Sequence, residues 1–173
     1  MSPEKNLQMA IKALPHVVSE DKDVLLVVKG RTVDRKYLGF ILKLIKKLNV
    51  SKYVRFDFKW SPNVTMVYYY YRAADVYVHT SLSEAFGSLT LLEAMASGTP
   101  VVANNASSIP EAVGNAGLLV NSEEELAEKI LEILHDDSLR RKLSREGFRR
   151  VIENFSLKIT AKKYLQLYRK LMG

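Results

Sequence analysis

The stretch His79–Pro100 decides the fold, and it runs HTSLSEAFGSLTLLEAMASGTP. The residues just before it, Asp75–Val78, are mostly apolar and β-branched or aromatic, which predicts a strand that ends at His79. A loop follows, then Gly87–Ser97 predicts a helix and Pro100–Ala103 a second strand. Because a helix connects the two strands, we expect them to run parallel.

The same alternation continues on both sides of this stretch. Further strands are predicted at Val24–Val28, Tyr53–Phe58 and Gly117–Val120, and the unbroken apolar run of the first is typical of a strand buried on both faces. Apolar residues at helical spacing predict helices beginning at Ser2 and covering Leu7–Val18, Leu38–Leu48, Val64–Ala74 and Ser122–Leu134, with two basic helices after them, the last at Ser156–Met172. The pattern predicts the α/β class: a Rossmann-like, doubly wound parallel sheet in one domain, residues 1–173, with helices at its C-terminal end.

The composition narrows the functional classes. Without cysteine the 173-residue chain has no disulfide or thiolate metal site, and His16, His79 and His135 are not at metal-ligand spacing from one another. No apolar run reaches the roughly 20 residues that span a membrane, and Met1–Asn6 lacks the apolar core of a signal peptide. We therefore expect a cytoplasmic protein without a metal cofactor.

Much of the net charge of +7 comes from the C-terminal region. One interpretation is a solvated helical face, and another is a surface that holds the protein on an anionic membrane. No aromatic stacking platform accompanies these charges, so nucleic acid is not an expected partner. The basic residues are Arg140, Arg141, Lys142, Arg145, Arg149, Arg150, Lys158, Lys162, Lys163, Arg169 and Lys170.

Parallel sheets bind ligands at the carboxyl ends of their strands, which directs attention to four loops: Gly30-Arg31, Lys59–Asn63, Thr80–Ser88 and Asn104–Glu111. The third of these loops, Thr80–Ser88, lies in the most informative stretch of the sequence. This loop has a carboxylate, Glu84, and a glycine, Gly87, where backbone amides at the positive end of a helix can approach an anion. Inside the helix, Glu93 interrupts an apolar segment that we expect to be buried, where a carboxylate needs strong donors such as ribose hydroxyls. The plainer interpretations are a half-exposed Glu93 in a salt bridge or cap, and a solvated Glu84.

These residues resemble the donor-site signature of family 4 retaining glycosyltransferases, which have the two-domain GT-B fold. The strongest match is SEAFG at 83–87 with LEAMASGTPVV at 92–102, and the resemblance covers nearly the whole chain. Other matches follow in family order: SPEKN at 2–6, AADV at 73–76, IPE at 109–111, GLLV at 117–120 and NFS at 154–156. The resemblance implies that the chain is the C-terminal, nucleotide-sugar-binding half of such an enzyme.

The resemblance also implies roles for particular residues. Lys5 would contact the donor diphosphate, Glu84 would be the catalytic residue facing the donor sugar, and Glu93 would hold the ribose diol. Trp60 would stack on the base. With Lys5 and a helix end supplying positive charge, no divalent metal would be required. Backbone groups at the start of the helix would bind sugar hydroxyls or phosphate, and these belong to Phe86, Gly87, Ser88 and Leu89.

Three features depart from the family pattern. Eight residues, not the usual seven, separate Glu84 from Glu93, and Ser107-Ser108 replaces a usual Gly-Gly pair. The first strand of the family's domain, which ends in Gly-Arg, is absent, so we expect its neighbours to lack ladder partners. We interpret the chain as a fragment of a longer enzyme that lacks the acceptor-binding domain, and we expect it to be inactive alone.

Two alternatives remain open. One is a sugar-nucleotide epimerase of the same fold. The other is a non-catalytic interaction module in which the basic C-terminal helices bind a partner and the donor site is a relict. In the leading interpretation, the resemblance implies that the last helix crosses back to the other domain, so we expect part of its apolar stripe to be exposed here and to favour self-association.

Overall fold

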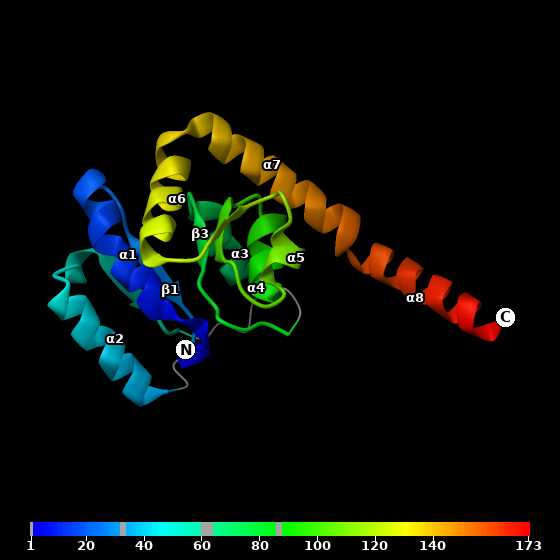
Figure 1. Ribbon diagram of the computed structural model, residues 1–173, viewed down its shortest axis with the longest axis horizontal. Coiled ribbons are helices and arrows are strands. Elements are labelled where there is room, and N and C mark those ends of the chain that lie inside the picture. The colour runs from blue at the N-terminus through cyan, green and yellow to red at the C-terminus, as the bar shows by residue number, and fades with distance from the viewer. Residues whose placement is uncertain (1, 32–33, 60–63, 86–87) are drawn as a thin grey trace.

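The computed structural model describes residues 2–31, 34–59, 64–85 and 88–173 (Figure 1). Strands and helices alternate along the chain, and every strand pair is parallel, which confirms the predicted α/β class. The strands are β1 (Leu26–Lys29), β2 (Val54–Asp57), β3 (Tyr77–His79), β4 (Val101–Asn104) and β5 (Leu118–Val120). The α-helices are α1 (Leu7–Glu20), α2 (Arg35–Lys47), α3 (Val64–Ala73), α4 (Leu89–Ala96), α5 (Ile109–Val113), α6 (Glu123–His135), α7 (Asp137–Asn154) and α8 (Leu157–Met172). Two short 3₁₀ helices, η1 (Pro3–Lys5) and η2 (Ser51–Tyr53), complete the order.

The first helix begins later than predicted. Pro3–Lys5 forms the 3₁₀ turn η1, and Asn6 then adopts a left-handed conformation with φ of 49° before α1 starts at Leu7. Asparagine tolerates this conformation better than most residues, so the chain changes direction here. The prediction of one continuous helix from Ser2 is therefore wrong, and the change of direction sets the position of Lys5.

Strand β4 is the centre of the larger core. Val102 packs with α1 and α6, against residues such as Met9, Val17 and Leu126. Its neighbours Val101 and Ala103 point to the other face and pack against α4, α5 and α7. All four residues of β4 are buried, so helices cover both faces of the sheet here, as a doubly wound fold requires.

The described sheet is in two parts. β1 pairs with β2, with Leu26 opposite Val54, and β3, β4 and β5 form a second sheet in that order. In the described part of the chain, β1 and β3 each have one strand neighbour, although Leu26 and Val78 contact the same core. A strand placed between β1 and β3 would join both parts in the usual doubly wound order.

Strand β1 is not buried on both faces, contrary to prediction. Leu26 packs toward α1 and α2, whereas Leu25 and Val27 on the opposite face are 51% and 40% exposed. An apolar run is compatible with burial of both faces of a strand, but it does not show that a layer of helices covers each face. In the described residues a helical layer covers one of them.

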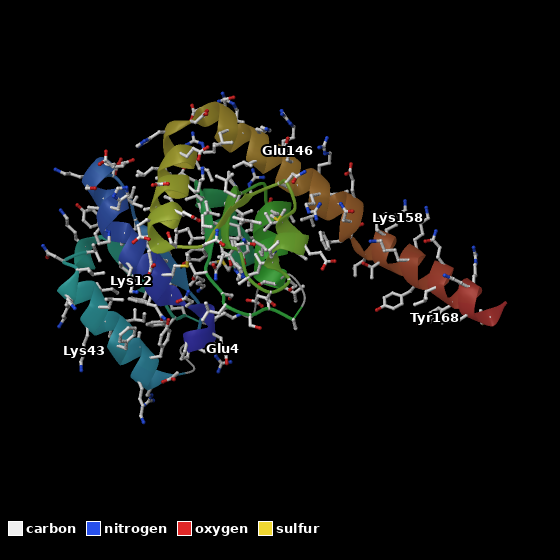
Figure 2. The ribbon with its side chains drawn as sticks, viewed as in Figure 1. Glu4, Lys12, Lys43, Glu146, Lys158 and Tyr168 are labelled. Carbon is white, nitrogen blue, oxygen red and sulfur yellow. The ribbon has the colours of Figure 1, made fainter. Side chains whose placement is uncertain are left out.

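The C-terminal helices differ in how they pack. α7 lies across α4, where Gly147 allows close approach to Met95. α8 extends away from the body of the molecule and has no buried residue (Figure 1). Figure 2 shows its side chains, Lys158 and Tyr168 among them, projecting into open space. The expected exposure of its apolar stripe is confirmed. Among the described helices, none combines the length and apolar character that crossing a bilayer demands.

Candidate functional site

The N-terminal turn η1 docks on the loop that follows β3. The backbone amide of Leu82 donates to the carbonyl of Glu4 at 2.9 Å, and the Thr80 hydroxyl donates to the carbonyl of Lys5 at 2.9 Å. The same loop is tied to the end of β4, where the Asn104 side-chain amide donates to the carbonyl of Ser81 at 3.2 Å. These contacts bring the first residues of the chain to the carboxyl ends of β3 and β4, where such folds bind ligands.

Lys5 and Glu84, both predicted site residues, meet at this edge. The Lys5 ammonium donates to Glu84 Oε1 at 2.6 Å, and their side chains are 52% and 12% exposed. Partial burial works to raise the pKa of the Glu84 carboxyl, but hydrogen bonds from Lys5 and Ser81 outweigh it and hold the pKa below its usual value. Glu84 is therefore a fixed carboxylate rather than the solvated loop acid of the plainer interpretation.

The backbone of Glu84 is held from the next loop. The hydroxyls of Ser107 and Ser108 donate to its carbonyl oxygen at 2.9 and 2.7 Å. Ser107 itself has a φ of 53°, a conformation that favours glycine. The serines that depart from the family's Gly-Gly pair thus add two hydrogen bonds that fix the loop containing the additional residue.

His79, which the sequence analysis did not assign to the site, lies beneath this pair. It is 5% exposed, and its Nε2 is 3.4 Å from Glu84 Oε1, the oxygen that Lys5 contacts. Burial lowers the pKa of His79 to about 4, since the opposing attraction of Glu84 is smaller and the Lys5 ammonium lowers the pKa further. Its position at the carboxyl end of a strand, directly before the Glu84 loop, was the signal that could have identified it.

Helix α4 begins where the loop that contains Glu84 ends. Its first residue is Leu89, two positions after the predicted Gly87, and the Leu89 side chain is 75% exposed. Ser88 precedes it with a φ of 54°, is buried, and bonds through its hydroxyl to Thr90 Oγ1 at 3.0 Å. Two other predicted donor-binding residues, Phe86 and Gly87, lie outside the described residues.

Glu93 is exposed, and the prediction that it is buried in an apolar segment is wrong. At 100° per residue, Leu91, Ala94 and Met95 share the core side of α4, and Glu93 falls opposite them. Its carboxylate accepts a hydrogen bond from the Tyr71 hydroxyl at 3.1 Å. The exposure expected in the plainer interpretation is therefore confirmed, although the partner of the Glu93 carboxylate is a tyrosine hydroxyl rather than a cation or a helix cap. Glu93 does not need a ligand to offset burial.

A second polar cluster joins β1, β2 and α3. The Lys29 ammonium donates to Asp57 Oδ2 at 2.9 Å and to the Lys59 carbonyl at 2.6 Å, and the Tyr70 hydroxyl also bonds to Asp57. Hydrogen bonds from Tyr70 and Lys29 hold the pKa of Asp57 well below its usual range. The neighbouring Tyr71 bonds to Glu93, so α3 contributes one tyrosine hydroxyl to Asp57 and another to Glu93. Trp60, the predicted base-stacking residue, lies outside the described residues.

Other parts of the described surface offer little for a ligand. No group of three or more metal-ligating side chains occurs in residues 2–31, 34–59, 64–85 and 88–173. Asp21 and Asp23 stand just after α1, at the opposite end of that helix from Lys5. Two shallow hollows lie away from Glu84: one between α1 and α6, near Lys12 in Figure 2, and one lined by α7 residues including Arg149.

The described chain is thus a parallel, doubly wound α/β domain with a cation and a carboxylate at the carboxyl ends of its strands. Residues 1–150 match the family described as glycosyl transferases group 1, and the chain belongs to that family. It is 34% identical over 163 residues to the alpha-monoglucosyldiacylglycerol synthase of Streptococcus pneumoniae, covering 92% of this chain and 36% of that protein. It is 31% identical to the D-inositol 3-phosphate glycosyltransferase of Corynebacterium glutamicum, covering 97% and 41%.

Solved structures agree with this assignment. The C-terminal domain of a glycosyl transferase group 1 family protein from Francisella tularensis superposes with a TM-score of 0.79 and 29% identity, covering 91% of this chain and 83% of that one. Sucrose-phosphate synthase from Thermosynechococcus elongatus gives 0.80 and 29%, covering 99% and 43%. The fold is that of a GT-B C-terminal domain, and the chain spans less than half the length of the curated relatives it matches.

Burial of neutral His79 predicts a pH dependence of stability. Its folded-state pKa of about 4 is below the ordinary 6.5, so the unfolded chain binds more protons between these values. The free energy of unfolding should therefore fall as pH drops from 6.5 towards 4, by up to roughly 3 kcal/mol. Urea denaturation across this range measures the effect.

His79→Phe should flatten this profile, because the buried ring can then no longer take up a proton. Its Nε2 makes no hydrogen bond to a described residue, but the replacement loses the contact between Nδ1 and the Tyr77 hydroxyl at 3.4 Å, so the comparison uses the slope of stability with pH and not the absolute stability. His16→Phe is the matched control, since His16 is exposed. An equal acid sensitivity in both variants would show that His79 is not the group responsible.

Proposed function

We propose that this chain is the donor-binding domain of a family 4 retaining glycosyltransferase and binds a nucleoside diphosphate sugar at the carboxyl ends of β3 and β4. The observation that carries the proposal is the Lys5–Glu84 pair, formed where η1 docks on the loop that follows β3. It puts a cation for phosphate and a carboxylate for sugar hydroxyls within one small area. A structure of TarM from S. aureus solved with UDP, 26% identical with a TM-score of 0.80, supports a nucleotide ligand.

Each group has a distinct part in this proposal. Lys5 contacts the diphosphate, together with backbone amides near Ser88 and Leu89 at the positive end of α4. Glu84 faces the donor sugar and stabilises the positive charge that develops there during transfer. Glu93 accepts hydrogen bonds from the ribose hydroxyls through its exposed carboxylate, which Tyr71 orients. Lys5 and the helix end supply the positive charge for the leaving diphosphate, so the proposal needs no divalent metal.

The acceptor belongs to another part of the whole enzyme. The curated relatives are more than twice as long as this chain, and we infer that an acceptor-binding domain completes the cleft. Glu93 is exposed and Lys5 is half exposed, which suits a site that a second domain covers. The isolated chain should then bind donor without transferring sugar, whether the acceptor is a glycan or a lipid-linked molecule. Sugar transfer by the whole enzyme, which an epimerase does not perform, distinguishes this proposal from an epimerase of the same fold.

Donor binding should depend both on Lys5, which contacts the diphosphate, and on Glu93, which contacts the ribose. We expect Lys5→Ala and Glu93→Ala each to weaken binding of a nucleoside diphosphate glucose by roughly tenfold, since each loses a charge-assisted hydrogen bond of about 1.4 kcal/mol. Isothermal titration calorimetry with UDP-, GDP- and ADP-glucose measures the affinity. Thermal shift gives a second readout, because a ligand raises the stability of the state that binds it.

Lys12→Ala and Glu132→Ala are matched controls for this experiment. Both residues form ion pairs on other parts of the surface, with Glu123 and Lys129 respectively. They should leave donor affinity within about twofold of the unmodified chain, a small change on the affinity scale. Affinities unchanged by the two site variants, or reduced equally by the controls, would contradict the donor site.

We also propose a second function for α8, the binding of an anionic membrane surface. The helix has no acidic residue, and at 100° per residue Leu157, Tyr164 and Tyr168 share one side while its basic residues gather on the other. A strongly basic face beside an apolar one with tyrosines suits the interface of an anionic bilayer. The enzyme would then be cytoplasmic and peripheral on the membrane. Self-association through the same apolar side is the alternative outcome.

Neutralising the basic side of α8 should release the protein from lipid. Replacing Lys158, Lys162 and Lys163 by Gln should reduce sedimentation with phosphatidylserine vesicles at least tenfold, because each lysine contributes about 1 kcal/mol near such a surface. The same change at Lys43, Lys46 and Lys47 on α2 is the charge-matched control and should have little effect. Equal binding to phosphatidylcholine vesicles, or dimers that form without lipid, would contradict a role for the basic charges.

A further inference from the structure

Glu84 Oε1 has two basic neighbours that approach it from different elements. Lys5 reaches it from η1 at 2.6 Å, and His79 Nε2 reaches it from the end of β3 at 3.4 Å. The lysine side chain is half exposed, whereas the histidine is 95% buried. Lys5 can therefore leave the carboxylate for a solute, but His79 stays below it.

The hydrogen bonds around His79 define which nitrogen faces Glu84 without a proton. The Tyr77 hydroxyl donates its single hydrogen to Thr90 Oγ1 at 3.1 Å, and its oxygen is 3.4 Å from His79 Nδ1. In the neutral ring Nδ1 then has the proton and donates to Tyr77, which leaves Nε2 unprotonated. Consistent with this, Nε2 is buried and makes no hydrogen bond to a described residue. Two lone pairs, on Nε2 and on Oε1, face each other, and Lys5 offsets their repulsion.

Moving the Lys5 ammonium away from Glu84 would change the charge balance between Glu84 and His79. The groups that face His79 are Tyr77 on its own strand, Glu84 on the loop and Lys5 on η1. If the ammonium moves away, a carboxylate remains beside an unprotonated ring nitrogen with no cation near it. A proton on Nε2 then restores one positive charge and makes a hydrogen bond to the same oxygen.

We propose that Glu84 exchanges partners when the donor binds: Lys5 moves to the diphosphate, and His79 takes up one proton from solvent on Nε2 and replaces Lys5 at Glu84 Oε1. The inference rests on the proposed donor site and adds His79 to it as a positioning residue. The proton comes from solvent and forms one N–H bond at Nε2, and no other covalent bond forms or breaks. His79 keeps the Glu84 carboxylate directed at the sugar after its first partner has gone.

Proton uptake on binding tests the exchange. Titration calorimetry of the 173-residue chain at pH 6.5 uses UDP-, GDP- and ADP-glucose, whose diesterified diphosphates do not titrate near this pH. The binding heat is compared in two buffers of different ionisation enthalpy. We expect the heats to differ by an amount equal to roughly half a proton or more taken up per ligand bound, because the exchange favours imidazolium at a pH near the usual pKa of histidine.

Two variants assign that proton. His79→Phe should abolish the proton uptake. It should also reduce the affinity gained from the sugar by about fivefold. This gain is the ratio of the affinity for a nucleoside diphosphate glucose to the affinity for the nucleoside diphosphate alone. The variant should leave binding of the nucleoside diphosphate itself within about threefold, which loss of the fold would not do. His16→Phe should retain both the uptake and the ratio. These fold-changes correspond to about 1 kcal/mol or less.

A second measurement avoids any substitution. In proton NMR titration of the unmodified chain, the pKa of the buried histidine should be near 4 without ligand and about 6.5 or higher when the chain is saturated with ligand, as uptake of half a proton at pH 6.5 requires. Binding without proton uptake, or uptake that persists in His79→Phe, overturns the exchange and leaves the donor site standing. If none of the three sugar nucleotides binds, the donor site and the exchange fail together.

Discussion

The ion pair between Lys5 and Glu84 connects residues 79 positions apart and determines where the site can be. Neither residue is placed by its own element alone. η1 is held to the loop after β3 by two hydrogen bonds, from the Leu82 amide and the Thr80 hydroxyl to its backbone carbonyls. That loop is held in turn by serine hydroxyls and by Asn104 from the β4 side. Because the site combines three separate segments, any displacement of η1 would separate the cation from the carboxylate.

The groups gathered at the carboxyl edge of the sheet also determine one another's protonation. Partial burial alone would favour a neutral Glu84, and the short bond from Lys5 reverses that preference. The same ammonium disfavours charge on His79, which burial already keeps neutral. One exposed lysine therefore influences the protonation of two less exposed groups, and a ligand that competes for this lysine changes both. Glu93 is linked to the site differently, through Tyr71 on α3.

Much of this architecture followed from the sequence because it depends on local patterns. The alternation of apolar runs with helical periodicity predicted a parallel α/β fold. The rule that ligands bind at strand carboxyl ends pointed to four loops, and the resemblance to the family's donor-site signature selected the Glu84 loop among them. Pairwise contacts between distant segments have no such signal, so the serine contacts to Glu84 emerged only in three dimensions. His79 ends a predicted strand directly before the Glu84 loop, but its approach to Glu84 Oε1 depends on the conformation of that loop. Glu93 was misplaced because α4 is short and almost wholly apolar, which leaves the phase of its buried side undetermined. The exposed face of β1 reflects a covering layer, and an apolar run alone does not reveal whether that layer is present.

The most direct test of the central claim is the position of the bound nucleotide on the chain. Amide chemical-shift mapping with UDP, GDP and ADP reports it without any substitution. The account predicts that the perturbed amides gather at Lys5, Thr80–Glu84, Ser88 and Thr90, with smaller changes at Tyr71. Perturbations confined to the hollow between α1 and α6, or to α7 and α8, with the Glu84 loop unaffected, would contradict it.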